Sequence, residues 1–507
     1  MTREFLPAGT AGIIEAIGLP KLATLEADAL VVFLTEGGVG DGAAATVDAA
    51  TGGLLARLAA AGELGGRRSE CVPLLAPAGL AVGQVLVVGL GRREEVDAGV
   101  VYRAAATAAR HLAGRPRSRV AFLAEPSWTT PWLEQAVAGA AVGMVGQDLY
   151  RSEPKRTRFG VTQWVGADAA TVARGAILGD GVNLARRLVN ASPDHMYPES
   201  FAEEAAAVAG RTGLEIEIWD EERLRRERCA ALLAVAKGSA RPPRLVLLRY
   251  RGRPRQSGDQ PDLALVGKGV TFDSGGLSLK PSESMMGMKM DMSGGASVLA
   301  AIATIAALEL PIHVVAAVGL VENMTGPAAY KLGDVITARS GTTIEIHNTD
   351  AEGRVVLADV LDVVRGLAPR RMVDLATLTG ACMVALGYDG GAVYQRPGLL
   401  RRAGRRGPRR GRAGLAAADV RRLWRPDQKR RGRHQERGRR PLGGRDHGGQ
   451  VPGAVRGRHP LDPCRHCRPG VRRKAPPVDR RRGHRRDGAI TRGVGPRDGL
   501  TLPHRVW

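Results

Sequence analysis

At the centre of the chain stands Val266-Gly-Lys-Gly-Val-Thr-Phe-Asp-Ser-Gly-Gly-Leu-Ser-Leu-Lys280, with Lys289-Met-Asp-Met-Ser293 a few residues further on. The overlapping run Leu263-Ala-Leu-Val-Gly267 is continuously apolar, which predicts a buried strand that opens into a glycine-rich loop. Open α/β sheets place their sites just beyond the carboxyl ends of such strands. We therefore expect the polar residues of this stretch to face a functional site.

A second polar motif, Asn348-Thr-Asp-Ala-Glu-Gly-Arg354, follows the strand-like run Thr343-Ile-Glu-Ile-His-Asn348. Side chains two residues apart in an extended chain point to the same side. We therefore expect Asp350, Glu352 and Arg354 to face one cavity.

The two motifs together are rich in potential metal ligands. Taken singly, an Asp in a glycine-rich loop is more often a turn former, and a Lys is usually a solvated surface charge. Ligands at this density instead favour Mg²⁺, Mn²⁺ or Zn²⁺, and a pair of such ions can hydrolyse peptides or phosphates. The potential ligands are Lys268, Asp273, Asp291, Asp350 and Glu352, with Lys280 and Arg354 as two further cations.

These motifs resemble the signatures of the leucyl (cytosol) aminopeptidases. The resemblance is carried by Gly267–Pro281 and by Asn348–Arg354, the second being highly specific for that family. It spans roughly residues 180 to 387 and includes Leu184-Ala-Arg-Arg-Leu-Val-Asn190 and Ala376-Thr-Leu-Thr-Gly-Ala-Cys382.

The resemblance implies two divalent metal ions, Mn²⁺ or Zn²⁺. Asp273 and Glu352 would bridge the two ions, Lys268 and Asp291 would complete one site, and Asp350 would complete the other. Lys280 and Arg354 match the two catalytic positions of the family. The implied reaction is hydrolysis of the first peptide bond of peptides with a free N-terminus, with a preference for leucine, by a homohexamer assembled through its catalytic domains.

Elementary chemistry is compatible with these roles. Lys268 would bind a metal only as the neutral amine, which two adjacent dications would favour by depressing its pKa. Lys280, if charged, would stabilise the oxyanion of a tetrahedral intermediate. Arg354 cannot act as a base because its pKa is above about 12. The matching Arg of the family holds a bicarbonate ion that shuttles the proton.

Alternating strand-like and helix-like segments predict an α/β protein with two domains, each a mixed sheet flanked by helices. We expect a non-catalytic domain over 1–150, a linker and connecting helix over 151–180, and an incomplete catalytic domain over 181–394. Expected strands are 29–34, 85–90, 120–123, 245–250, 263–266, 312–320 and 372–376, and expected helices are 102–112, 132–145, 169–189, 295–308 and 352–367.

Five methionines lie among the metal candidates, at Met285, Met286, Met288, Met290 and Met292. In the resembled family, a methionine-lined pocket near the metals receives an apolar N-terminal side chain. Ordinary filling of the core is an equal alternative for any one of them.

The charge of the chain is concentrated at its C-terminal end. Residues 401–507 hold 33 of the 74 Lys and Arg but only 8 of the 51 Asp and Glu, so the first 400 residues carry a net charge of −2. The body is thus an ordinary, slightly acidic protein. The tail, 395–507, is rich in Arg, Gly and Pro, and in its own right it predicts disorder.

A shifted reading frame explains this tail better. Arg-, Gly- and Pro-rich text is what a GC-rich gene yields out of frame. With the last two bases of each codon joined to the first base of the next, Leu442–Pro452 can be decoded to include Gly-Gly-Ala-Ile-Thr-Ala-Ala-Lys-Phe-Leu. Likewise, Arg458–Gly470 can yield Asp-Thr-Pro-Trp-Ile-His-Val-Asp-Ile-Ala-Gly-Pro-Ala. Both resemble C-terminal motifs of the family, in the right order, so we place a frame shift near Tyr394.

Two other function classes are alternatives for this sequence: a nucleic-acid binder and a catalytically dead scaffold. A nucleic-acid binder acting through the basic tail is disfavoured, because the tail lacks aromatic residues beyond Trp424 and Trp507. A catalytically dead scaffold would be separated from an enzyme by an activity assay. Five scattered cysteines give no disulfide framework, no apolar signal region follows Met1, and the most apolar run, 298–320, is interrupted by charge and proline. We therefore expect a cytoplasmic protein without a membrane partner.

Overall fold

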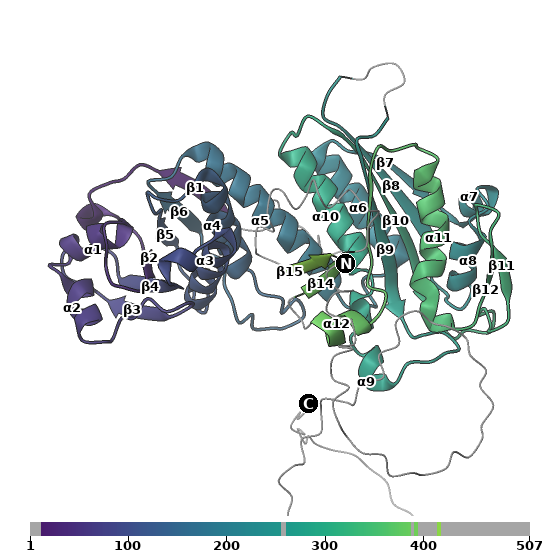
Figure 1. Cartoon of the computed structure of the whole chain (residues 1–507), viewed down its shortest axis with the longest axis horizontal. Coiled ribbons are helices and arrows are strands. Elements are labelled where there is room, and N and C mark those ends of the chain that lie inside the picture. Colours follow the sequence, from purple (N-terminus) through teal and green to yellow (C-terminus); the bar gives the residue numbers. More distant parts are fainter. Residues whose placement is uncertain (1–11, 255–259, 387–389, 394–412, 417–507) are drawn as a thin grey trace, which may run out of the picture. The chain divides into compact units, whose positions relative to one another are not determined.

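The computed structural model describes residues 12–254, 260–386, 390–393 and 413–416. These residues form two α/β units, each a sheet covered by helices (Figure 1). The α/β class predicted from the sequence is confirmed. The expectations for the tail, disorder and a shifted frame, lie outside the described residues except at Ala413–Ala416.

The first sheet has six strands in the order β1-β6-β5-β2-β4-β3, all parallel to their neighbours except β3, which is antiparallel to β4. Its strands β2 and β4 are buried throughout, apart from Thr35 at the end of β2, and therefore read as continuous apolar runs in the sequence. The strands are β1 Ile13–Ile17, β2 Ala29–Thr35, β3 Cys71–Leu75, β4 Gln84–Gly91, β5 Arg119–Leu123 and β6 Val161–Val165.

Helices cover both faces of this sheet, and each face has its own hydrophobic cluster. On one face, Phe122 stacks on Trp164 with ring centroids 4.9 Å apart. Asp97 caps the long helix α3 by accepting a hydrogen bond from the backbone N–H of Val100 at 2.8 Å. The helices are α1 Ala43–Ala50, α2 Leu54–Ala60, α3 Ala98–Leu112 and α4 Thr130–Gly143, with short 3-10 turns at Leu22–Thr24 and Arg93–Glu95.

The position of β6 corrects the expected linker. The sequence predicts a linker and a connecting helix over 151–180, but Val161–Val165 form a buried strand between β1 and β5. The strand is short and contains Thr162 and Gln163, so it lacks the apolar run that marks its neighbours. The connecting helix itself is present as α5, Ala169–Asn190, which packs against both α4 and α10.

The second sheet has five strands in the order β13-β9-β10-β8-β7. The strands β13, β9 and β10 run parallel, whereas β8 is antiparallel to both β10 and β7. Because β9 and β10 are parallel, their carboxyl ends lie side by side, with Asp273 paired to Asn323. The strands are β7 Glu215–Trp219, β8 Arg244–Arg251, β9 Leu263–Asp273, β10 His313–Asn323 and β13 Met372–Leu375.

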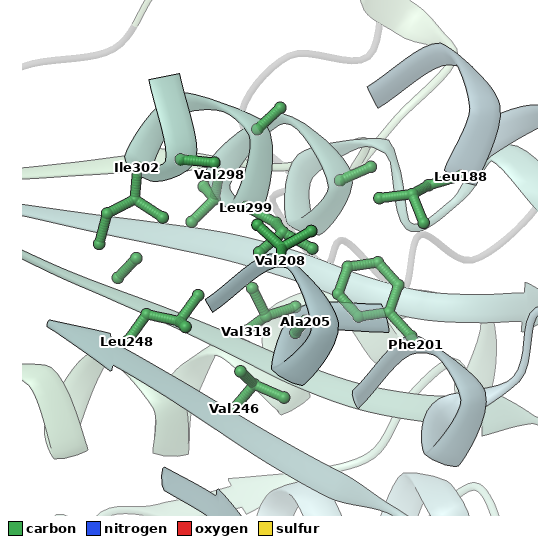
Figure 2. Close-up of a cluster of buried hydrophobic side chains, with 14 of the residues drawn as sticks. Leu188, Phe201, Ala205, Val208, Val246, Leu248, Val298, Leu299, Ile302 and Val318 are labelled. Carbon is green, nitrogen blue, oxygen red and sulfur yellow. The ribbon is translucent and has the colours of Figure 1, made fainter. Parts of the chain in front are cut away.

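Helices also cover both faces of the second sheet. On one face, apolar side chains of α5, α6 and α10 pack on β8 and β10, as shown by Phe201, Ile302 and Val318 (Figure 2). On the other face, α8 and α11 pack on the same sheet. The helices are α6 Pro198–Thr212, α7 Glu221–Arg226, α8 Ala230–Ala236, α9 Ser282–Met285, α10 Ser293–Ala307, α11 Glu352–Arg365 and α12 Ala381–Leu386, with 3-10 turns η3 Met288–Met290 and η4 Thr349–Ala351.

Two small strand pairs complete the described structure. β11 Val335–Thr337 and β12 Thr343–Glu345 form an antiparallel ribbon, and β14 Gly390–Val393 pairs with β15 Ala413–Ala416 in parallel. The strand-like run 343–348 therefore contributes to a separate ribbon and not to the main sheet. One described helical stretch, Ser282–Ala307, is long and apolar enough to cross a bilayer, but 61% of its apolar window is buried inside this protein, as in a core helix.

Candidate metal centre

The two polar motifs meet at the carboxyl ends of β9 and β10. Asp273 ends β9, and its Oδ1 accepts the backbone N–H of Gly275 at 2.9 Å, which turns the chain out of the strand. The φ of Gly275 is +89°, a left-handed conformation that a side chain would strain. The loop that follows carries Lys280 back toward the strand end.

Thr349 links the two motifs directly. Its hydroxyl donates to the backbone oxygen of Gly275 at 2.7 Å and accepts the backbone N–H of Ser278 at 2.7 Å. In return, the Ser278 hydroxyl accepts the N–H of Thr349 at 3.2 Å. These bonds join segments 71 residues or more apart in the chain and bring Asp350 beside Asp273.

Asn323 fixes the same region from β10, and sequence reasoning missed it. Its side-chain amide is fully buried and donates to Asp273 Oδ1 at 2.9 Å and to the Thr349 carbonyl at 3.0 Å. The Tyr330 hydroxyl donates to the same carbonyl at 2.7 Å. The only sequence signal for Asn323 is that it follows the apolar run 312–320, at the edge where α/β sheets carry their sites.

The geometry of the second motif differs from the extended conformation expected from the sequence. Asn348 caps the 3-10 turn η4 by accepting the N–H of Asp350 at 2.8 Å, and Glu352 begins α11. Alternation of side chains therefore does not apply across the motif. Asp350 and Glu352 still approach Asp273, but Arg354, on the first turn of α11, is exposed.

Carboxylate oxygens of Asp273, Asp350 and Glu352 lie within 4.8 Å of one another, and Asp273 and Glu352 are each only 2% exposed. Lys268, in the middle of β9 and equally buried, reaches the same cluster. Its Nζ lies 2.7 Å from Glu352 Oε1 and 2.8 Å from Asp291 Oδ2. All five predicted ligands are thus brought into one centre.

Gly353 explains how a buried lysine fits there. A Cβ at this position would lie 2.5 Å from Lys268 Cε and 2.7 Å from Nζ. Real side chains do not tolerate such contacts, so the glycine between Glu352 and Arg354 provides the space that the lysine occupies.

Lys280 is held by the other half of the cluster. Its Nζ lies 2.9 Å from Asp273 Oδ2 and 2.5 Å from Asp350 Oδ1, and its side chain is 15% exposed. Burial lowers the pKa of Lys280, but hydrogen bonds to the two carboxylates outweigh it and raise that pKa well above its usual value. The ammonium is therefore charged throughout the neutral range.

Burial and charge also shift the other groups. Burial raises the pKa of Asp291 and of Glu352, against the opposing effect of Lys268. For Lys268, burial lowers the pKa, but Asp291 and Glu352 raise it by more. Since a lysine binds metal only as the free amine, a cation that binds these carboxylates has to displace this proton.

The residues present fit divalent cations. Four carboxylates, of Asp273, Asp291, Asp350 and Glu352, face two ammonium groups, so the cluster carries an excess of negative charge. Glu352 Oε2 is buried and has no hydrogen-bond partner among the described residues. Unsatisfied carboxylate oxygen at a buried anionic cluster is the chemistry that a hard or borderline cation satisfies.

This fold presents a carboxylate cluster suited to metal ions at its strand ends, and sequence comparison specifies the family. Residues 31–154 match the N-terminal domain of the cytosol aminopeptidase family, and residues 183–406 match its catalytic domain. The chain belongs to the cytosol aminopeptidase family. Its members are aminopeptidases, and the resemblance inferred from the two motifs is confirmed.

Relatives and solved structures agree with this assignment. The chain is 49% identical to a probable cytosol aminopeptidase of Rhodopirellula baltica over 60% of this chain, but the match spans only 59% of that relative. A probable cytosol aminopeptidase of Syntrophotalea carbinolica is 40% identical over 75% of this chain and 78% of its own length.

Two solved structures carry the same fold. The bottromycin maturation enzyme BotP in complex with Mn is similar with a TM-score of 0.66 and 32% identity, covering 79% of this chain and 85% of BotP. A mutant of tomato leucine aminopeptidase is similar with a TM-score of 0.70 and 27% identity, covering 80% of this chain and 81% of the tomato chain.

The tight fit around Gly353 generates a prediction. Gly353→Ala should weaken metal retention by roughly tenfold or more, because Lys268 cannot yield without losing its buried partners. Metal analysis after dialysis against graded chelator measures this. Gly287→Ala is the matched control, since nothing lies within 4 Å of a Cβ there. Equal retention by both variants would contradict the account.

Proposed function

We propose that this chain, in its intact reading frame, is a metal-dependent aminopeptidase that releases N-terminal residues from peptides, with a preference for leucine. The convergence of carboxylates from the buried Asp273 and Glu352 and the half-buried Asp350 within 4.8 Å carries the proposal. Lys268 and Asp291 would complete one ion site and Asp350 the other, with Asp273 and Glu352 shared. We expect the ions to be Mn²⁺ or Zn²⁺.

When bound, two such ions would polarise the scissile carbonyl and activate a water molecule. The remaining work falls to residues of the chain. Lys280, charged and held beside Asp273 and Asp350, is suited to stabilise the oxyanion that forms on the carbonyl. The exposed Arg354 offers its guanidinium to a small anion, and we assign to it the bicarbonate that would carry the proton to the leaving amine.

Restriction to N-termini follows from the same arrangement. A free α-amine is a neutral ligand at the pH where it is deprotonated, so it can approach a cation held by the carboxylates and fix the first peptide bond. We further propose that the corrected chain assembles as a homohexamer through its catalytic domains and works in the cytoplasm.

Removal of metal tests the function itself. In the frame-corrected chain, chelation should abolish hydrolysis of an N-terminal leucine amide, and added Mn²⁺ or Zn²⁺ should restore it. Hydrolysis is followed by release of free leucine. Full activity in a strong chelator would sink the proposal of a two-metal centre.

The role of Lys280 is tested separately. Lys280→Ala should lower kcat by roughly 10²–10³-fold, as the loss of an oxyanion stabiliser does, with unchanged metal content. Lys331→Ala, at a lysine that is 67% exposed and pairs with Asp334, is the control and should leave kcat at the parental value. If Lys280→Ala instead loses its metals while the loaded fraction keeps its kcat, Lys280 is a ligand or a structural residue.

Two observations support the shifted frame. The match to the catalytic domain of the family ends at residue 406. In addition, large apolar side chains of β13 and of the residues after it are exposed: Val373 is 42% exposed, Leu378 46% and Val384 82%. A native edge of a catalytic domain would bury such side chains, at roughly 1.5–3 kcal/mol each.

We therefore expect the 507-residue product to have an unstable catalytic domain and little or no peptidase activity. Leaving several such side chains exposed removes much of the free energy of unfolding, which is typically only about 5–15 kcal/mol for a whole domain. A single-base correction near codon 394 should restore a soluble enzyme, and sedimentation of that enzyme tests the hexamer. Both versions are purified and assayed side by side, and comparable activity from the uncorrected chain would show that the tail is tolerated.

A further inference from the structure

Thr377 lies outside both polar motifs but contacts two candidate ligands of the first polar stretch, Lys268 and Asp291. It follows the edge strand β13 by two residues and is half-buried. Its hydroxyl donates to Asp291 Oδ1 at 2.7 Å and lies 3.2 Å from the backbone oxygen of the same residue. Its own carbonyl accepts a hydrogen bond from Lys268 Nζ at 2.6 Å.

We infer that Thr377 is a positioning residue that sets both Lys268 and Asp291 for one divalent cation. The inference rests on the proposed function, because it concerns the ion site that these two residues would complete. Thr377 touches no reacting atom in this account. It acts through the two side chains that it holds.

The chemistry of a lysine ligand explains the carbonyl contact. A neutral amine has one lone pair and keeps two N–H groups, and its direction toward a cation is set by where those N–H groups point. The carbonyl of Thr377 accepts one of them, while the β9 backbone fixes the other end of the Lys268 side chain. Partners of this kind orient the ligands of metal sites in general.

The hydroxyl contact does the same for Asp291. Oδ1 accepts hydrogen bonds from both the Thr377 hydroxyl and Lys268 Nζ, the latter at 2.9 Å. Oδ2 lies 2.8 Å from the same Nζ and is buried without a hydrogen-bond partner among the described residues, so it stays available to a cation. Because the hydroxyl ties the Thr377 backbone to Asp291, removing it also loosens the carbonyl that orients Lys268. A single substitution is therefore expected to disturb two ligands of one site.

Thr379 provides a matched comparison within the same Thr-Leu-Thr-Gly segment. It is exposed, and its carbonyl accepts the N–H of Cys382 at 3.4 Å. A valine at either position has the same shape and the same β-branching as threonine. The two variants thus differ in the ligand contacts that they remove.

The test compares Thr377→Val, Thr377→Ser and Thr379→Val, in the full 507-residue chain and in its frame-corrected counterpart. Each protein is loaded with Mn²⁺ or Zn²⁺ and dialysed against graded chelator, and the bound metal is measured. Thr377→Val should lose one of two ions at roughly 10–100-fold lower chelator strength than the parent. Thr377→Ser and Thr379→Val should follow the parent. Thermal unfolding of the metal-free proteins provides a second readout.

The outcomes separate this inference from its foundations. Parental retention by Thr377→Val overturns it, as does equal loss by Thr377→Val and Thr379→Val. A purely structural Thr377 would lower the unfolding temperature of the metal-free variant without selective loss of one ion, which also overturns it. A parent that binds no metal in either version would instead refute the proposed metal centre, and this inference with it.

Discussion

The catalytic unit is organised around one electrostatic constraint: four carboxylates gather at one sheet edge, three of them buried and the fourth, that of Asp350, half-buried. Like charges in such a place repel, and burial alone raises the pKa of Asp291 and Glu352. The cluster is tolerable because cations stand among the acids, Lys268 on one side and Lys280 on the other. A buried charge without such a partner would cost several kcal/mol. The same excess of negative charge makes the cluster suited to metal ions.

The fold meets this constraint by joining segments that are distant in the chain. Parallel pairing of β9 with β10 sets Asp273 beside Asn323, whose amide donates to both the carboxylate and the Thr349 loop. Thr349 then binds the loop that carries Lys280. The ligand geometry thus depends on a network that contains few of the ligands themselves.

Much of this was predictable, for physical reasons that differ from residue to residue. The strand β9 is predictable from its apolar run, which arises because the strand is buried on both faces. The glycine-rich loop after it indicates a sheet edge. The local path of residues 348–354 was not predictable from alternation, because Asn348 redirects the chain into a 3-10 turn by capping it. Asn323 and Thr377 were missed because their roles arise from tertiary contacts, which leave no local pattern in the sequence. β6 was missed because it is short and partly polar.

In the described structure, the residues of the candidate metal centre and the weakly supported sheet edge are different parts of the chain. All the candidate ligands, and the residues that contact them, precede residue 378, so the candidate metal centre lies upstream of the Arg-rich tail. The sheet edge beside this centre has fewer contacts. Thr377 follows β13, which pairs only with β9 among the described strands, and Val373 of β13 is 42% exposed. An edge strand with one partner opens more readily than a central strand. A chain can therefore contain every candidate ligand and still fail to hold these residues in place. The least stable part of the centre is the edge strand β13 and not the carboxylates.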